Sequence, residues 1–169
     1  MLKRKVYQEL LKWKENTEGK ALCIIGARQI GKTTLIREFG KNEYEHFAEI
    51  NFVTDEKAAD IFNDRLTAEV IITNLTAYLQ TPLEPGKTLI LFDEVQECPA
   101  VRSAIKFLVE DGRFDYIESG SLLGVRYKEV RSYPVGFEQI VPMYPLDFEE
   151  YLWACLLYTS PSPRDRSVS

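Results

Sequence analysis

The sequence is poor in the residues and segments that mark several classes of protein. It has one histidine, His46, and its three cysteines show no paired spacing, which argues against a zinc site and a disulfide framework. No apolar run approaches the roughly 20 residues of a membrane span, and no apolar secretory core follows the basic residues at the start. We therefore expect a cytoplasmic protein without a membrane partner, with His46 at a surface or boundary position and Cys23 in the core.

Basic residues are also fewer than acidic residues. The 169 residues include 21 Lys and Arg against 26 Asp and Glu, which gives a net charge of −5. Nonspecific nucleic-acid binding depends on basic surfaces that neutralise phosphates, so the composition disfavours it, although a local basic patch stays open. Hydrophobic residues make up 45% of the chain and charged residues 28%, which is typical of a globular domain with its own core.

The most informative stretch is a complete phosphate-loop motif. Residues 26–33 match the pattern G-x-x-x-x-G-K-[ST] in full. Residues 21–25 predict a buried strand before the loop, and residues 34–39, with Gly40 as a stop, predict a helix after it. Strand, loop and helix are the context that this motif requires. The candidate nucleotide-binding residues are therefore Gly26, Ala27, Arg28, Gln29, Ile30, Gly31, Lys32, Thr33 and Thr34.

The residue types in this loop suit phosphate chemistry. Gly26 and Gly31 allow backbone conformations and a close approach that other residues forbid. The N–H groups of the loop and of the helix N-terminus can then converge on an anion. Lys32 can reach the outer phosphates, where it is also a candidate catalytic residue, and the Thr33 hydroxyl can ligate Mg²⁺, which prefers oxygen. Arg28 could contact phosphate, a partner or only solvent.

An acidic pair follows a second apolar strand. Residues 88–92 predict a buried strand, and Asp93 and Glu94 come directly after it, about 60 residues beyond the phosphate loop. A carboxylate at this place holds magnesium in P-loop enzymes, usually through water. Glu94 can accept a proton from the attacking water or orient that water. We therefore expect Asp93 to be a metal ligand and Glu94 to be the catalytic base.

Two serines at the end of a further expected strand are candidates for the same site. Residues 116–119 predict a short strand that continues toward Ser121. The hydroxyl of Ser119 or Ser121 could contact the γ-phosphate or the attacking water, but a simple serine–glycine turn explains the pattern equally well. Arg126 and Arg131 follow, and neither stands out as the catalytic arginine.

Helical and strand patterns alternate along the chain. Thr54 and Thr67 can cap two helices, and Pro99 suits the first turn of another. Strands alternating with helices imply a parallel sheet covered on both faces, which is an α/β fold of the three-layer α/β/α sandwich type. Ligands in such folds bind beyond the carboxyl ends of the strands. The other expected elements are helices at 3–15, 55–63, 67–80, 99–111 and 145–153 and strands at 47–52 and 140–143.

Residues 155–169 differ in character from the rest. The run Cys-Leu-Leu-Tyr-Thr-Ser-Pro-Ser-Pro-Arg-Asp resembles the translation of a transposase adapter used in sequencing-library preparation. A disordered Ser/Pro-rich tail is the alternative. We expect a domain at residues 1–154, a tail at 155–169 that is not native, and a native C-terminal domain that is missing from this sequence.

Four segments together resemble one family. They are Gly-Ala-Arg-Gln-Ile-Gly-Lys-Thr-Thr, Leu-Phe-Asp-Glu-Val-Gln-Glu-Cys-Pro, Ser-Gly-Ser-Leu-Leu-Gly and Tyr-Pro-Leu-Asp-Phe-Glu-Glu-Tyr-Leu. Residues 1–154 are similar to the AAA-type P-loop ATP-binding proteins of prokaryotes that carry a C-terminal domain of unknown function. The resemblance implies a central strand order of 5-1-4-3-2. It assigns nucleotide binding to Gly26, Gly31, Lys32 and Thr33. It also assigns magnesium binding to Asp93, the role of catalytic base to Glu94, and the role of polar sensor to Ser119 or Ser121.

The leading functional hypothesis is an ATPase module that couples ATP binding and Mg²⁺-dependent hydrolysis to work done by the missing domain. A P-loop small-molecule kinase is one alternative, although the acidic pair fits activation of water better. A nucleotide-gated binding module with little turnover is another. The chain has no Asn-Lys-x-Asp or Thr-Lys-x-Asp pattern to read guanine, so ATP is preferred to GTP. A homo-oligomer and a nucleic-acid partner both stay open.

Overall fold

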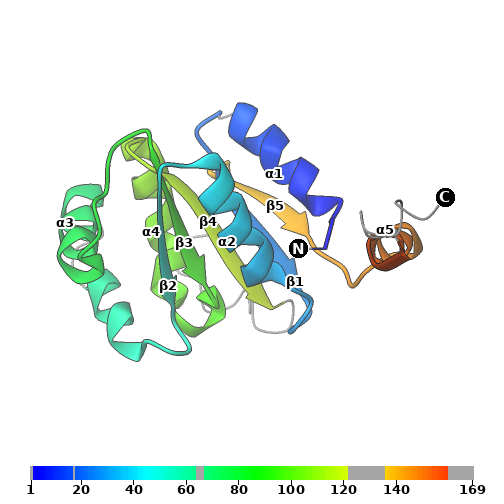
Figure 1. Ribbon diagram of the computed structural model, residues 1–169. Coiled ribbons are helices and arrows are strands. Elements are labelled where there is room, and N and C mark those ends of the chain that lie inside the picture. The colour runs from blue at the N-terminus through cyan, green and yellow to red at the C-terminus, as the bar shows by residue number, and fades with distance from the viewer. Residues whose placement is uncertain (1, 17, 64–66, 122–135, 160–169) are drawn as a thin grey trace.

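The computed structural model describes residues 2–16, 18–63, 67–121 and 136–159. Its described strands form one parallel sheet in the order β2-β3-β4-β1-β5 (Figure 1). This is the order 5-1-4-3-2 read from the other edge, so the expected topology is confirmed. The strands are β1 (Ala21–Gly26), β2 (His46–Asn51), β3 (Thr88–Asp93), β4 (Asp115–Ser121) and β5 (Glu138–Pro142). The helices are α1 (Val6–Glu15), α2 (Lys32–Glu43), α3 (Ala68–Leu79), α4 (Pro99–Asp111) and α5 (Phe148–Thr159), with short 3₁₀ helices η1 (Glu56–Phe62) and η2 (Val95–Glu97).

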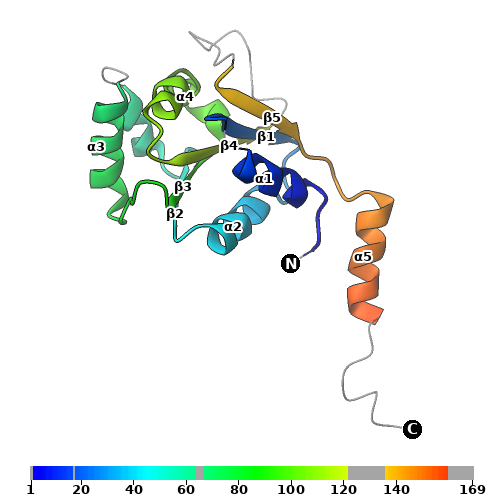
Figure 2. The same cartoon turned by 90° about the horizontal axis from the view of Figure 1, so that it is seen from above.

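Helices cover both faces of the sheet, as the sequence predicts for a three-layer α/β/α sandwich. Helices α1 and α2 lie on one face and α3 and α4 on the other (Figures 1 and 2). Strand β3 shows the reason, because every residue in it is buried. Leu89 and Leu91 belong to the core that contains α1 and α2, whereas Ile90 and Phe92 belong to the core that contains α3 and α4. Burial on both faces explains the continuous apolar run at residues 89–92 of this central parallel strand.

The two predicted threonine caps have different outcomes. Thr67 caps α3, since its hydroxyl oxygen accepts a hydrogen bond from the Val70 N–H at 3.4 Å. Thr54 does not cap a helix, and residues 56–62 form the 3₁₀ helix η1 instead. The reason is local: the side-chain oxygen of Asn51 accepts from the Thr54 N–H at 3.2 Å, which draws Thr54 into a turn at the end of β2.

Two other boundaries differ from the prediction. Gly40 lies inside α2, which continues to Glu43, rather than ending it. A Cβ atom at Gly40 would come within 2.3 Å of the Phe47 ring, so the glycine lets the helix pack closely against β2. Strand β4 extends to Ser121 because its last residue still pairs in register with Gly26 of β1.

Helix α5 begins three residues later than expected and extends further. Asp147 and Glu150 form a capping box at its start: Asp147 Oδ1 accepts from the Glu150 N–H at 2.8 Å, and Glu150 Oε1 accepts from the Asp147 N–H at 3.2 Å. The helix continues from Phe148 to Thr159, across the expected boundary between domain and tail. It projects away from the sheet (Figure 2).

A buried charged cluster lies between the sheet and α4. The guanidinium of Arg102, a residue that is only 3% exposed, donates to Glu138 Oε1 at 3.0 Å and lies 3.6 Å from Glu118 Oε2. It also contacts the thiol of Cys23 at 3.0 Å, in the core position expected for that cysteine. Burial raises the pKa of the Glu118 carboxyl well above its ordinary range, although the charge of Arg102 opposes the shift. One cation therefore holds carboxylates from two different strands.

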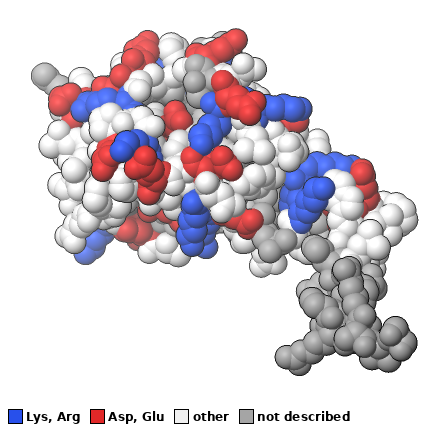
Figure 3. Space-filling view, turned by 45° about the horizontal axis from the view of Figure 1, so that its top comes forward, with Lys and Arg blue, Asp and Glu red and all other residues white. Residues whose placement is uncertain are grey.

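The surface carries charge of both signs. Basic and acidic side chains are interspersed over the face shown in Figure 3. His46 is half-buried, with Nε2 3.2 Å from Glu84 Oε1, which fits the boundary position expected for it. Among the described residues, no helix combines the length and apolar character needed to cross a bilayer.

Candidate functional site

The phosphate loop connects β1 to α2 at the carboxyl edge of the sheet. Gly31 has a φ of +92° and Gln29 a φ of +62°, so the chain turns twice through the left-handed region. Gly31 supplies one of these conformations without steric cost. Gly26 is needed for a different reason, because a Cβ atom there would come within 2.4 Å of the Met143 carbonyl oxygen. Both motif glycines therefore have separate physical roles.

Lys32 places a buried cation inside this loop. The residue is 6% exposed, and its Nζ donates to the carbonyl oxygens of Gly26 at 3.1 Å and Ala27 at 2.6 Å. Burial lowers the pKa of Lys32, and the negative charges of Glu94 and Asp93 act in the opposite direction. The ammonium group thus lies within the loop and close enough to the acidic pair for the negative charges to affect its pKa.

Asp93 is the centre of a hydrogen-bond network at the end of β3. Its Oδ2 accepts from the Thr33 hydroxyl at 2.8 Å and from Asn51 Nδ2 at 3.1 Å, and its Oδ1 accepts from the Ser119 hydroxyl and from the Glu94 N–H. The residue is only 1% exposed, so these donors replace water around the carboxylate. The structure therefore brings together the two predicted metal ligands, Thr33 and Asp93. Hydroxyl and carboxylate oxygens are the donor set that suits Mg²⁺.

The two candidate serines have different surroundings. Ser119 is fully buried and contacts Asp93 directly. Ser121 pairs in register with Gly26, which places it beside the start of the phosphate loop. Ser119 is thus the serine joined to the acidic pair. Arg126 and Arg131 lie outside the described residues.

The remaining loop residues differ in exposure. The side chain of Ile30 packs against the core shared by α1 and α2. Thr34 lies in the first turn of α2, where its N–H is one of the helix-terminal donors. Arg28 and Gln29 line an open pocket beside the loop.

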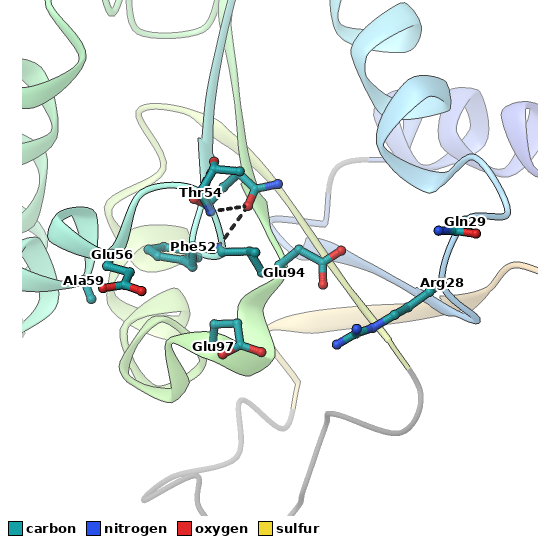
Figure 4. A pocket seen from close by; sticks show the side chains of 10 residues that line it. Arg28, Gln29, Phe52, Thr54, Glu56, Ala59, Glu94 and Glu97 are labelled. Carbon is teal, nitrogen blue, oxygen red and sulfur yellow. Dashed lines mark hydrogen bonds between the residues drawn. The ribbon is translucent and has the colours of Figure 1, made fainter.

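Glu94 faces that pocket from an unusual backbone conformation. Its φ of 59° and ψ of 46° lie in the left-handed region, which a residue other than glycine rarely adopts and which is enriched at functional sites. Its carboxylate accepts a hydrogen bond from Gln96 Nε2. The pocket has a volume of about 630 Å³ and is lined from the other elements by Asn51, Phe52, Val53, Thr54, Glu56, Ala59 and Glu97. Figure 4 shows Arg28 and Glu94 directed into it from opposite sides.

Sequence reasoning missed two side chains that hold the acidic pair. Asn51 donates to Asp93, and its own oxygen accepts from the Val53 N–H at 3.0 Å, so it ties the pocket wall to the predicted metal ligand. A polar residue at the end of a strand adjacent to β3 was the available signal, since Asn51 and Asp93 are register partners. Gln96 donates to the Glu94 carboxylate; it lies in one of the four segments that resemble the family, but that resemblance assigned it no role.

The parallel sheet, the loop and the acidic pair define a P-loop NTPase fold of the α/β class. Two solved structures share the fold. The Walker-type ATPase Paby2304 of Pyrococcus abyssi gives a TM-score of 0.51 at 16% identity, over 98% of this chain and 61% of that one. A variant of RuvB from Thermotoga maritima gives a TM-score of 0.53 at 21% identity, over 94% of this chain and 50% of that one.

Residues 18–152 match the family described as AAA domain, and the chain belongs to that family. The AAA-type P-loop ATPase expected from the sequence is therefore confirmed. No curated protein matches the sequence. Because the chain spans only 61% and 50% of the two solved structures, their likeness concerns the shared domain.

Proposed function

We propose that the chain binds Mg²⁺·ATP in the phosphate loop and hydrolyses the ATP. The observation that carries this proposal is the direct contact of Thr33 with Asp93 beside the buried ammonium of Lys32. The hydroxyl and the carboxylate can bind the magnesium ion of a magnesium nucleotide, and the ammonium group can bind its β- and γ-phosphates. When bound by Thr33 and Asp93, Mg²⁺ would neutralise charge on these phosphates. Membership of the AAA domain family supports ATP as the nucleotide.

Glu94 is the proposed catalytic base. Water attacks the γ-phosphorus, the bond to the oxygen of the β-phosphate breaks, and the proton of the water passes to the Glu94 carboxylate. Lys32 stabilises the negative charge of the γ-phosphoryl group during the transfer. Asn51 and Ser119 hold Asp93 in place through its two oxygens and so orient the proposed metal ligand, and the hydroxyl of Ser119 or Ser121 is the proposed polar sensor of the γ-phosphate or the attacking water.

A small-molecule kinase is the second candidate, and the pocket beside Glu94 is the observation that favours it. A volume of about 630 Å³ exceeds what a single water molecule needs and would admit a phosphoryl acceptor. A kinase transfers the phosphoryl group to that acceptor, whereas an ATPase releases phosphate without one. Phosphate release in the absence of any added acceptor separates the two functions.

The first prediction tests nucleotide binding. Replacing Lys32 with alanine removes the cation inside the loop, and we expect the affinity for Mg²⁺·ATP to fall roughly 10- to 100-fold, as for the loss of a charged hydrogen bond. Lys41→Ala is the matched control, because Lys41 is exposed in the last turn of the same helix. Calorimetry on the folded proteins measures both. A Lys32→Ala chain that binds ATP as tightly as the unmodified chain would disprove the assignment.

We propose further that residues 1–154 form the ATPase module and that residues 155–169 are not native to it. In the native protein, a C-terminal domain would use the energy of hydrolysis, and a homo-oligomer is compatible with this arrangement. The match to the AAA domain family lies within the proposed module.

The second prediction concerns these last residues. A chain that ends at Ala154 should unfold at the same temperature as the full chain, because Leu156 is 64% exposed and residues with so little burial add little to stability. Thermal unfolding followed by circular dichroism measures the difference. A drop of about 4 °C, on the order of 1 kcal/mol for a domain of this size, would show that the end of α5 belongs to the fold.

A further inference from the structure

Arg4, near the start of the chain, joins three segments that are distant in sequence. Its side chain is 8% exposed, and Nη1 donates to the carbonyl oxygen of Ile30 in the phosphate loop at 3.0 Å. Nη2 donates to the carbonyl oxygen of Tyr144, between β5 and α5, at 2.5 Å, and Nε donates to Glu150 of α5 at 2.8 Å. The guanidinium therefore connects the phosphate loop with α5 and with the segment before it.

The contact with Ile30 fixes one peptide unit of the loop. The Ile30 carbonyl and the Gly31 N–H belong to the same trans peptide, so they point in opposite directions. With Arg4 bonded to the carbonyl, the Gly31 N–H points away from Arg4, and the N–H groups of such a loop favour an anion where they converge. Gly31 has a φ of +92° and could rotate easily without such a constraint.

Glu150 holds Arg4 in this position. Its Oε2 accepts from Arg4 Nε and from the Lys5 N–H at 3.0 Å, while its Oε1 completes the capping box with Asp147. Burial opposes the charge on Glu150, but hydrogen bonds from the Asp147 N–H and from Arg4 lower its pKa below the ordinary value. The ionised carboxylate of Glu150 thus accepts hydrogen bonds both from its own helix cap and from the arginine that it positions.

The N-terminal segment is held against α5 by further contacts. Lys5 Nζ lies 2.7 Å from carboxylate oxygens of Asp147 and Glu149, and Lys3 Nζ lies 4.5 Å from the ring centroid of Trp153. Basic and acidic side chains meet at the base of this helix in Figure 3. A change in the orientation of α5 would therefore move Arg4 along with the N-terminal segment.

We propose that Arg4 is a positioning residue that orients the Ile30–Gly31 peptide for phosphate binding, and that Glu150 makes this orientation depend on α5. The proposal rests on the proposed function, since it assigns regulation to the same nucleotide site. Any partner or domain that shifts α5 would loosen or tighten nucleotide binding through two side chains. In return, a bound phosphate would favour the present orientation of α5, because such coupling is reciprocal.

The test compares Arg4→Met with the unmodified chain and with Arg113→Met, a control that removes an arginine paired with Asp111 and Glu69 away from the loop. We expect Arg4→Met to shift the ¹H–¹⁵N signal of the Gly31 amide and to weaken Mg²⁺·ATP binding about tenfold, as for one lost phosphate donor. Arg113→Met should change neither. Millimolar guanidinium chloride, but not sodium chloride, should restore part of the affinity of Arg4→Met, which a merely structural defect would not allow.

The outcomes of this test separate the role of Arg4 from the proposed function. A folded Arg4→Met chain with the Gly31 signal and the ATP affinity of the unmodified chain would overturn the proposal. If the unmodified chain binds no Mg²⁺·ATP, the proposed function fails, and the Gly31 signal still shows whether Arg4 orients the loop. If Arg4→Met does not fold, Glu150→Gln takes its place, since it keeps the shape but weakens the hold on Arg4. An unchanged Gly31 signal in folded Glu150→Gln would then contradict the coupling to α5.

Discussion

Replacing Glu94 with glutamine is expected to slow phosphate release from bound ATP about 10²- to 10⁴-fold, which is the usual contribution of a general base. Glutamine keeps the shape of the side chain and its contact with Gln96 but cannot accept a proton. Affinity for Mg²⁺·ATP should change little, because Thr33, Asp93 and Lys32 are untouched. Single-turnover release of phosphate measures the chemical step, and calorimetry measures the binding.

The matched control is Glu97→Gln, three residues further along. Glu97 lines the same pocket and carries the same charge, but it is not adjacent to Asp93. Its substitution should leave the rate within about a factor of three, in line with a surface electrostatic effect. Equal rates for Glu94→Gln and the unmodified chain would remove Glu94 from the mechanism.

Hydrolysis by the unmodified chain should itself be slow. Charge on the γ-phosphate in the transition state is commonly stabilised by an additional arginine, which is worth 10³–10⁵ in rate. Within the described residues, Arg28 is the one arginine that lines the pocket, and it comes from the phosphate loop rather than from a lid. A fast intrinsic rate would show that no further cation is required.

Replacing Arg102 with methionine should have the largest effect on stability. The substitution keeps an unbranched apolar side chain in place of the arginine stem but leaves the carboxylates of Glu118 and Glu138 buried without their cation. Breaking a buried ion pair from one side costs about 3–5 kcal/mol. Urea unfolding of the variant measures the loss of stability, and Arg113→Met, which breaks an exposed pair, is the control that should lose far less.

The loss of stability in Arg102→Met should be smaller at low pH than at high pH. The folded state already raises the pKa of Glu118, so it binds a proton more tightly than the unfolded chain does. Stability from such a group is present at low pH and is lost as the pH rises through the folded pKa. Arg102→Met should therefore be less destabilised near about pH 5 than near about pH 8. An equal loss at both values would mean that Glu118 takes up no proton in the folded variant.

The sequence was sufficient for the features that depend on local pattern. The phosphate loop was recognised because its glycines, lysine and threonine have a fixed spacing within eight residues, and Asp93 because a carboxylate follows four consecutive apolar residues. Strand order came from the resemblance of four segments to one family. The Thr67 cap was also predictable, since capping involves residues only three apart.

The features that the sequence did not reveal depend on contacts between distant residues. Arg4 and Glu150 are 146 positions apart, and nothing near either residue indicates their contact. Nothing in the sequence distinguished Arg102 from the other charged residues of its helix, although it is buried against β1, β4 and β5. Gly40 was expected to end a helix, because its real role, close packing against Phe47, is a tertiary contact that neighbouring residues do not reveal. Local propensity is overridden at such positions by the fold as a whole.

The most direct test of the proposed function is phosphate release by the unmodified chain under single-turnover conditions, with Mg²⁺·ATP and no acceptor. The proposed ATPase site predicts slow release that reaches one phosphate per bound ATP and stops when Mg²⁺ is removed. A chain that is saturated with Mg²⁺·ATP and releases no phosphate would contradict hydrolysis at this site.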